Sequence, residues 1–423
     1  MKKLLCLAMA LFMLLACFGT ALADDPAPKI VRLLSIESNT SELVELFNKS
    51  HTDIQMEQVY ISGSWDGVSQ KLPAMIAANE APDFAFMSFV DVAAYAAQGY
   101  LRDVTELVER DINMADFVPG VWEATMVEGK YWGVPYEIRV EQTWYDADVF
   151  DMMGVPYPSQ DWNEAWTLEE WRENLPKLTG TNPETGDSVY GHVWQGNLWY
   201  WSQLQWLMAA YGHTSPFDEN GRPIWDTPEM AQMLQDLYDM YQEGVLVPND
   251  IMAESGYKTL FANNRLAMYT GGTWNAQAVV DMNVHAMPNV GGRTNYWIDT
   301  WIMFNGTADP DAQWEVAKWL CSKEYWDWKI TEDVSCCLPI RADSFEEAKN
   351  TLWPWLTEAD RDCLFQGAEE AFAFPMEYHI KMPALNNASK EILNMIKTGE
   401  YATAQETCEA LQEYWQDIID DNI

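Results

Sequence analysis

The chain has 423 residues, of which 65 are Asp or Glu, 25 are Lys or Arg and 22 are Trp. Its formal net charge of -40 argues against nucleic acid as a partner and against docking on an anionic membrane surface, because both need exposed Lys and Arg. A hydrophobic share of 48% also excludes a disordered acidic tail, and the length is enough for roughly two to three domains.

The first 23 residues have the features of an export signal. Two lysines precede an apolar run that ends at Phe18, and a small-x-small sequence ends at Ala23. We expect cleavage after Ala23 and an exported protein, in the periplasm or at the outer face of the cell membrane. As an alternative, the sequence around Cys17 resembles a lipoprotein cleavage site, with Cys17 as the lipidated residue. No later stretch reaches about 18 uninterrupted apolar residues, so we expect no membrane-spanning helix in the mature chain.

After the leader, strands and helices alternate. Residues 30–36, 54–60 and 84–87 are short apolar runs typical of buried strands. Between them, apolar residues recur with the helical period over residues 43–47 and 68–76. Such a strand-helix-strand-helix-strand series predicts an α/β fold with a parallel, helix-covered sheet.

Residues 140–145 predict one more strand, and helices dominate the chain from there on. We predict helices over residues 168–178, 199–211, 228–244, 257–264 and 404–418. No flexible linker separates these segments. Two lobes would therefore have to be joined by strands that cross directly between them.

Polar and aromatic residues follow each of the first three predicted strands. Ligands of open parallel sheets bind beyond the carboxyl ends of the strands, so these loops are candidate ligand contacts. The first loop contributes Glu37 and Asn39, the second contributes Trp65, and the third contributes Ser88. The alternative interpretation is ordinary turn chemistry, since Ser, Asn and Gly favour turns in any protein.

Tryptophans outside helix interiors are the most unusual feature of the sequence. An indole offers a flat apolar face and an N–H donor, which match the C–H faces and the hydroxyl rim of a sugar ring. The candidate contacts of this kind, with one aspartate that lies between two of them, are Trp194, Trp274, Trp297, Asp299 and Trp301. The tryptophans on predicted amphipathic helices are expected to pack in the core instead: Trp206, Trp314, Trp319 and Trp415.

Known catalytic and metal-binding motifs do not occur in the sequence. There is no P-loop, no H-E-x-x-H and no G-x-S-x-G, and the five histidines show no ligand spacing. The adjacent Cys336 and Cys337 fit no standard zinc pattern. We therefore expect no catalytic residue, no metal and no cofactor. The five cysteines of the mature chain leave room for one or two disulfides, and because their number is odd we expect at least one free thiol.

Longer motifs follow one another along the mature chain: KLPAMIAA at residues 71–78, APD at 81–83, KYWGVPY at 130–136 and GGTW at 271–274. In their order and spacing, these motifs resemble the extracellular solute-binding proteins of carbohydrate ABC importers (family 1, of the maltose-binding-protein type). The resemblance covers most of the mature chain. Two positions depart from the family pattern, which usually has Asn in place of Asp146 and Gly in place of Asn264.

The resemblance implies two α/β lobes, each with a helix-covered, mostly parallel sheet, and a ligand cleft between them. The first lobe would comprise residues 24–135 with 285–335, and the second would comprise residues 136–284 with 336–423. Crossings near residues 135 and 283 would act as hinges for closure around the ligand. The implied partners are a carbohydrate and the membrane permease subunits of an ABC importer, and the protein would be a monomer.

The family's contact positions carry over to several residues of this chain, and the match at residues 82–83 places residues 87–89, with Ser88, where the family has a pocket loop. Trp274 matches the cleft tryptophan of the family, Trp194 lies near another contact region, and Tyr378 lies near a late aromatic contact. Arg139 stands where relatives usually have an acidic pocket residue, and Glu137 is a substitute for that role. Because guanidinium pairs well with carboxylate, Arg139 leaves open a ligand that carries a uronic acid.

Three functions compete at this point. The first is an extracellular binding protein for a carbohydrate, most simply an oligosaccharide. The second is a binding protein for a non-sugar solute such as a polyamine or peptide, whose ammonium group Glu37, Asp91 and Glu137 could hold. The third is a secreted glycosidase, which would also combine tryptophans with carboxylates.

Overall fold

The computed structural model describes residues 27–37, 40–62, 65–194, 201–333, 337–373, 381–398, 400 and 403–420. The predicted export signal and the candidate contacts Asn39 and Tyr378 lie outside the described residues. Trp65 begins a helix, but the position of its side chain is not described.

Ten of the described strands form one sheet in the order β2-β1-β3-β11-β6-β9-β8-β7, with β10 paired to β6 and β12 paired to β11. Two more strands, β4 and β5, form a small antiparallel ladder of their own. The strands are β1 (Lys29–Ser35), β2 (Ile54–Tyr60), β3 (Phe84–Ser88), β4 (Met126–Val127), β5 (Lys130–Tyr131), β6 (Gly133–Asp146), β7 (Gly180–Thr181), β8 (Ser188–Trp194), β9 (Leu266–Gly272), β10 (Val284–Met287), β11 (Thr294–Met303) and β12 (Ala371–Ala373).

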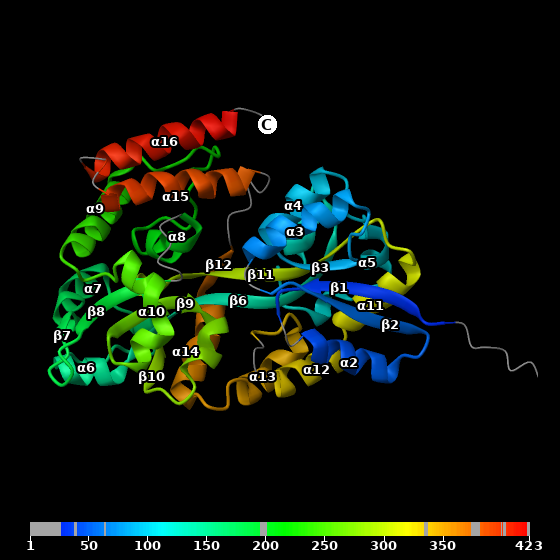
Figure 1. Cartoon of the computed structure of the whole chain (residues 1–423), viewed down its shortest axis with the longest axis horizontal. Helices are drawn as coiled ribbons and strands as arrows, with labels where there is room; N and C mark the ends of the chain where they lie inside the picture. The colour runs from blue at the N-terminus through cyan, green and yellow to red at the C-terminus, as the bar shows by residue number, and fades with distance from the viewer. Residues whose placement is uncertain are drawn as a thin grey trace, which may run out of the picture.

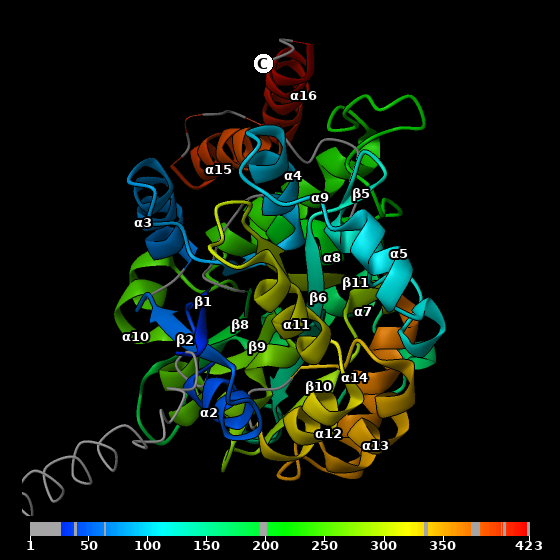
Figure 2. The same cartoon turned by 90° about the vertical axis from the view of Figure 1, so that its right-hand side faces the viewer.

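Helices cover this sheet on both sides (Figure 1). They are α2 (Thr40–Ser50), α3 (Trp65–Ala77), α4 (Phe89–Ala97), α5 (Thr105–Asp111), α6 (Ala147–Met153), α7 (Leu168–Asn174), α8 (Trp201–Ala210), α9 (Pro228–Gln242), α10 (Asn249–Ala262), α11 (Pro310–Leu320), α12 (Lys323–Glu332), α13 (Phe345–Thr351), α14 (Glu358–Glu370), α15 (Met382–Thr398) and α16 (Ala404–Asp420). The last two pack on each other and on α8 and α9, as Figure 1 and Figure 2 both show. Among the described helices, none is long and apolar enough to cross a membrane.

The predicted strands and helices are confirmed, most with errors of a few residues at their ends. The strand predicted over residues 140–145 is only the second half of β6, which begins seven residues earlier, at Gly133. The predicted helix over residues 168–178 is interrupted, because Pro176 has no amide to continue the hydrogen bonding of α7 and starts a short 3₁₀ helix instead. The predicted helix over residues 257–264 is the second half of α10, which bends at Gly256. That helix ends at Ala262, two residues earlier than predicted. Asn264, which was predicted to be its last residue, has a left-handed φ of 52°.

β6 is the strand that joins the two halves of the sheet. Its first half pairs with β11, and its second half pairs with β9 and β10. The ladders that link β11 to β3 and β6, and β6 to β9, are antiparallel, whereas β1 pairs in parallel with both β2 and β3. The sheet is therefore mixed, because the strands that cross between its halves run against their neighbours. The predicted lobe boundary at residue 285 falls within β10, which lies beside the second half of β6.

The aromatic side chains assigned to packing lie in the core. Trp206, Trp314, Trp319 and Trp415 are all buried, as the helical periodicity predicted. The described cysteines Cys321, Cys337, Cys363 and Cys408 are all buried and fill core positions.

Candidate functional site

Charged side chains from distant parts of the chain meet where β1 ends beside the crossing strands. We call this group the Arg139 cluster, and its members are Glu37, Glu137, Arg139, Asp299, Lys329 and Asp333. Glu37 follows β1, two members come from β6, one comes from β11, and the last two come from α12 and the residue after it. Five of the ion pairs of the described residues lie within this group.

The strand register brings these residues together. Arg139 lies opposite Trp297, Glu137 lies opposite Asp299, and Asp299 lies in turn opposite Ser88 on its other side. Because side chains alternate along a strand, the residues at 137 and 139 point to the same face of β6. Six of the predicted contacts, including Glu37, are thus gathered at one place in the sheet.

Arg139 is the centre of the cluster. Its Nη2 lies 2.7 Å from Glu37 Oε1 and 2.5 Å from Glu137 Oε1, and its Nε pairs with Asp299. Its guanidinium also lies over the ring of Phe86, with 5.7 Å between Cζ and the ring centroid. Burial by itself would lower the pKa of Arg139, but the surrounding carboxylates raise that pKa well above its usual value. The guanidinium is therefore held firmly by three carboxylates.

Lys329 is the second cation of the cluster, and the sequence interpretation missed it. Its side chain is only 1% exposed, and its Nζ lies 2.8 Å from Asp333 Oδ2 and 3.4 Å from Glu137 Oε2. The same ammonium donates to the hydroxyl of Tyr136 at 2.9 Å and lies 4.5 Å from the centre of that ring. The available signal was a lone lysine in the aromatic stretch of α12, which alone cannot reveal a partner that lies almost 200 residues away.

Carboxylates outnumber cations in the cluster, and burial penalises their charged forms. Burial raises the pKa of Asp299 to about 7, although Arg139 opposes that shift. Burial and the charge of Glu137 also raise the pKa of Glu37. Asp91, in the first turn of α4, has its pKa raised to about 7 by burial. The cluster thus offers an excess of hydrogen-bond acceptors in surroundings that favour a donor or a cation.

Two half-buried indoles lie beside the cluster. Trp297 lies opposite Arg139 in the β6–β11 ladder. With the amide of Asn295 oriented to satisfy both of its groups, that amide accepts from Trp297 Nε1 at 3.0 Å and donates to Glu141 Oε2 at 2.9 Å. Trp274 follows Gly272 by two residues, and Gly272 pairs with Glu141 on β6, two residues along that strand from Arg139. Trp297 therefore lies on a strand that pairs with β6 at Arg139, and Trp274 follows a strand that pairs with β6 beside Arg139. Both side chains remain partly exposed.

Gly272 explains how Trp274 reaches its position. A Cβ atom at residue 272 would lie only 2.1 Å from Cζ3 of the Trp274 ring. The six-membered ring of the indole therefore occupies the space that a side chain at residue 272 would need, so only glycine leaves room for it there. The neighbouring Thr273 fixes the segment to β6, because its hydroxyl accepts from the amide of Val140 at 3.3 Å.

Two of the predicted tryptophan contacts are placed elsewhere. Trp194 and Trp301 are each only 1% exposed. Trp194 packs against His192 and Trp206, and Trp301 packs against Phe86 and Tyr136. Both rings belong to the core because they lie on strands whose two faces are covered, which the sequence around them did not reveal.

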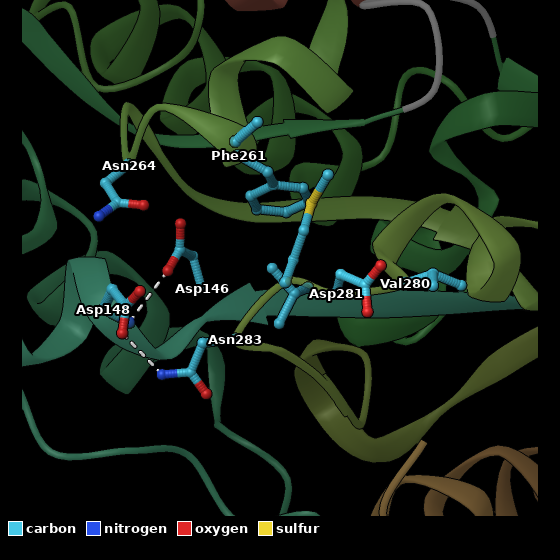
Figure 3. A pocket seen from close by; sticks show the side chains of 10 residues that line it. Asp146, Asp148, Phe261, Asn264, Val280, Asp281 and Asn283 are labelled. Carbon is cyan, nitrogen blue, oxygen red and sulfur yellow. Dashed lines mark hydrogen bonds between the residues drawn. The ribbon is translucent and has the colours of Figure 1, made fainter. Parts of the chain in front are cut away.

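A separate cavity of about 360 Å³ lies at the other end of β6 (Figure 3). Its lining includes Asp146, Asp148, Asn264, Asp281 and Asn283, and Asn283 donates to Asp148 Oδ1 at 2.6 Å. Asp146 is seven residues along β6 from the centre of the Arg139 cluster, about 23 Å at the rise of an extended strand. None of the predicted contacts lines this cavity, so it does not contribute to the candidate site.

Comparisons with known proteins agree on one family. Residues 35–325 match the family model described as bacterial extracellular solute-binding protein. A stretch of 195 residues is 33% identical to an uncharacterized lipoprotein of Streptomyces antibioticus, and it covers 45% of this chain and 41% of that protein. The chain thus spans less than half the length of this relative.

Solved structures share the fold over almost the whole chain. A substrate-binding protein of an ABC transporter from Listeria monocytogenes, in complex with cycloalternan, has a TM-score of 0.80 at 19% identity and covers 93% of this chain and 98% of its own. The GacH receptor of Streptomyces glaucescens, solved without ligand and with acarbose, has a TM-score of 0.75 at 19% identity and covers 93% and 99%. At these identities the similarity concerns the fold alone.

Proposed function

The chain belongs to the bacterial extracellular solute-binding proteins, and we propose that it binds an extracellular carbohydrate and delivers it to the permease of an ABC importer. The two-lobed α/β fold that the sequence predicted is confirmed by the solved structures. Within that fold, the Arg139 cluster lies on the strands that cross from one half of the sheet to the other. A solute bound there would lie between the lobes.

The observation that carries the proposal is the pairing of carboxylates with half-buried indoles. Glu37 and Arg139, whose side chains are 20% and 18% exposed, form the accessible edge of the cluster. Carboxylates accept strong hydrogen bonds from hydroxyl groups, and the faces of Trp274 and Trp297 suit the C–H faces of a sugar ring. Ser88, opposite Asp299, adds a hydroxyl at the same edge.

Two relatives of similar fold support a sugar as the solute. The Listeria protein is bound to cycloalternan, and the Streptomyces glaucescens receptor is bound to acarbose. We assign the lobes as predicted, to residues 24–135 with 285–335 and to residues 136–284 with 336–423. Closure of these lobes about β6 and β11 would enclose the sugar and complete its contacts.

Export is part of the same proposal. We propose a monomer that is exported through the leader that ends at Ala23 and acts outside the cell membrane. The alternative anchor at Cys17 is supported by the description of the Streptomyces antibioticus relative as a lipoprotein. The mass of the mature protein separates the two, because lipidation would add acyl chains to an N-terminal cysteine.

The direct test is a thermal-shift screen over plant and host oligosaccharides, followed by calorimetry on each ligand that stabilises the protein. Trp274→Ala is expected to weaken binding by about 1–3 kcal/mol, the range for losing an aromatic anchor. Tyr414→Ala on α16 is the control, because this exposed aromatic lies far from the cluster. Equal affinities of the wild type and Trp274→Ala would remove Trp274 from the site.

The acid excess of the cluster favours one other solute class, namely polyamines. Glu37 and Asp91, with their raised pKa values, would gain from a neighbouring ammonium group. Calorimetry with spermidine tests this alternative, and saturation by the polyamine with no response to any sugar would replace the carbohydrate assignment. Release of cleaved products from an oligosaccharide would instead indicate a glycosidase.

A further inference from the structure

We propose that Arg139 is a positioning residue for the carboxylates around it and does not bind an anionic ligand. The site would therefore select a sugar that carries no carboxylate, phosphate or sulfate group. This inference rests on the proposed carbohydrate binding and specifies which sugars the site accepts. The sequence had left open a ligand that carries a uronic acid, and the inference excludes that ligand.

The ion pairs of Arg139 occupy its Nε and Nη2, and a guanidinium that binds a carboxylate through two N–H bonds always uses Nη2 as one of the donors. Two parallel N–H bonds, such as those from Nε and Nη2, are needed for bidentate binding of a carboxylate. Nε pairs with Asp299, and Nη2 pairs with both Glu37 and Glu137. A ligand carboxylate bound through two N–H bonds would have to displace at least one of these side chains.

The displaced partner would lose contacts of its own. Glu37 also accepts from the hydroxyl of Tyr136, at 3.3 Å from Oε2. Glu137 Oε2 lies 3.4 Å from Nζ of Lys329, and the Glu137 side chain is only 1% exposed. Moving Glu37 would leave the Tyr136 hydroxyl without its acceptor, and moving Glu137 would take one of the carboxylates from the buried ammonium of Lys329. Both losses are costly in a protein interior.

The other cation of the cluster is not available either. Lys329 is almost fully buried and engaged by Glu137, Asp333 and the Tyr136 hydroxyl. Four carboxylates therefore face two cations, and an anionic ligand would add a further negative charge to a site that already carries an excess. Repulsion between like charges is strong where water is largely excluded.

The same arrangement suits ligands that donate hydrogen bonds. Arg139 holds Glu37 and Asp299 in fixed orientations, so their remaining lone pairs form a preorganised set of acceptors for hydroxyl groups. The raised pKa of Asp299, about 7, indicates an environment in which a nearby donor is favourable and a further anion is not. Specificity against anions would thus come from charge already present, with no steric exclusion.

Calorimetry on matched ligand pairs tests the inference. Each neutral oligosaccharide found by the thermal-shift screen is compared with its counterpart in which one hydroxymethyl group is a carboxylate. We expect the uronate to bind at least tenfold more weakly than the neutral sugar, a difference of about 1.4 kcal/mol. Binding of the uronate as tightly as the neutral sugar, or more tightly, overturns the inference but leaves carbohydrate binding intact.

A charge-removing variant gives a second measurement. Glu37→Gln takes one negative charge from the cluster and frees part of Arg139, so the ratio between neutral and uronate affinities should shrink severalfold. Asp236→Asn is the control, because Asp236 pairs with Arg172 on the far helices α7 and α9 and should leave the ratio unchanged. An unchanged ratio in Glu37→Gln contradicts the proposed role of the cluster.

Comparison of the neutral sugar with its uronate in the wild-type protein tests the inference even if Glu37→Gln does not fold. Absence of binding to every sugar, neutral or anionic, would remove the proposed function and this inference with it. A uronate that binds best in the wild type would remove only the inference.

Discussion

Replacement of Lys329 by methionine tests whether buried ion pairs hold the candidate site together. The methionine fills nearly the same space as the lysine stem, so the main change is loss of the ammonium group. Its partners Glu137 and Asp333, whose side chains are 1% and 4% exposed, then lose that cation. Breaking a buried ion pair from one side typically costs about 3–5 kcal/mol. Because Glu137 keeps its contact with Arg139, we expect a loss near the lower end, about 3 kcal/mol.

Urea unfolding followed by tryptophan fluorescence measures this loss as a shift in midpoint. The control is Lys323→Met on the same helix, because Lys323 and its partner Asp327 have side chains that are 47% and 44% exposed. Exposed pairs of this kind contribute at most about 1 kcal/mol. If Lys329→Met cost no more than this control, the cluster would not depend on its buried cation and the reasoning would be refuted. We also expect Lys329→Met to weaken sugar binding, because Glu137 helps to hold Arg139.

Two further predictions follow from single residues near the cluster. Gly272→Ala should displace the ring of Trp274 and weaken ligand binding by about 1–3 kcal/mol, as measured by calorimetry. The control is Gly306→Ala, which should bind the ligand with unchanged affinity because no atom lies within 4 Å of the added Cβ. Burial raises the pKa of Asp91 to about 7, so its contribution to stability is complete below about pH 4 and is lost as the pH rises through 7. Asp91→Asn should therefore stabilise the protein by about 1–2 kcal/mol at pH 8, after allowance for partial exposure, and by almost nothing at pH 4. A variant whose thermal midpoint at pH 8 matches the wild type would contradict this.

Much of the fold could be predicted because its signals are local. The short apolar runs at residues 30–36, 54–60 and 84–87 are the first three strands, and the periodic apolar residues between them form α2 and α3. Each of these elements is specified by side chains within a few residues of one another. The pairing of β6 with β11 and β9 was not visible in the same way, because the partners lie more than 100 residues away.

The candidate site was predicted in part. The loops after strands and the family resemblance led to Glu37, Ser88, Glu137 and Arg139, and the tryptophan pattern led to Asp299; the structure brings these residues together. They also led to Trp194 and Trp301, which are core residues. The local sequence around a tryptophan on a strand is the same whether a neighbouring helix covers the ring or the ring is open to solvent, so the sequence cannot separate the two cases.

The sequence by itself determined the kind of fold, the family and the chemistry available to the site, because motif order, periodicity and residue type are properties of the chain alone. Only the tertiary structure decided what Arg139 does. A lone arginine at a pocket position leaves an anionic ligand open, but three carboxylates and a buried Lys329 converge around Arg139 from segments up to about 290 residues apart. Electrostatic interactions depend on distance in space, and that distance is fixed only when the strands pair and the helices pack.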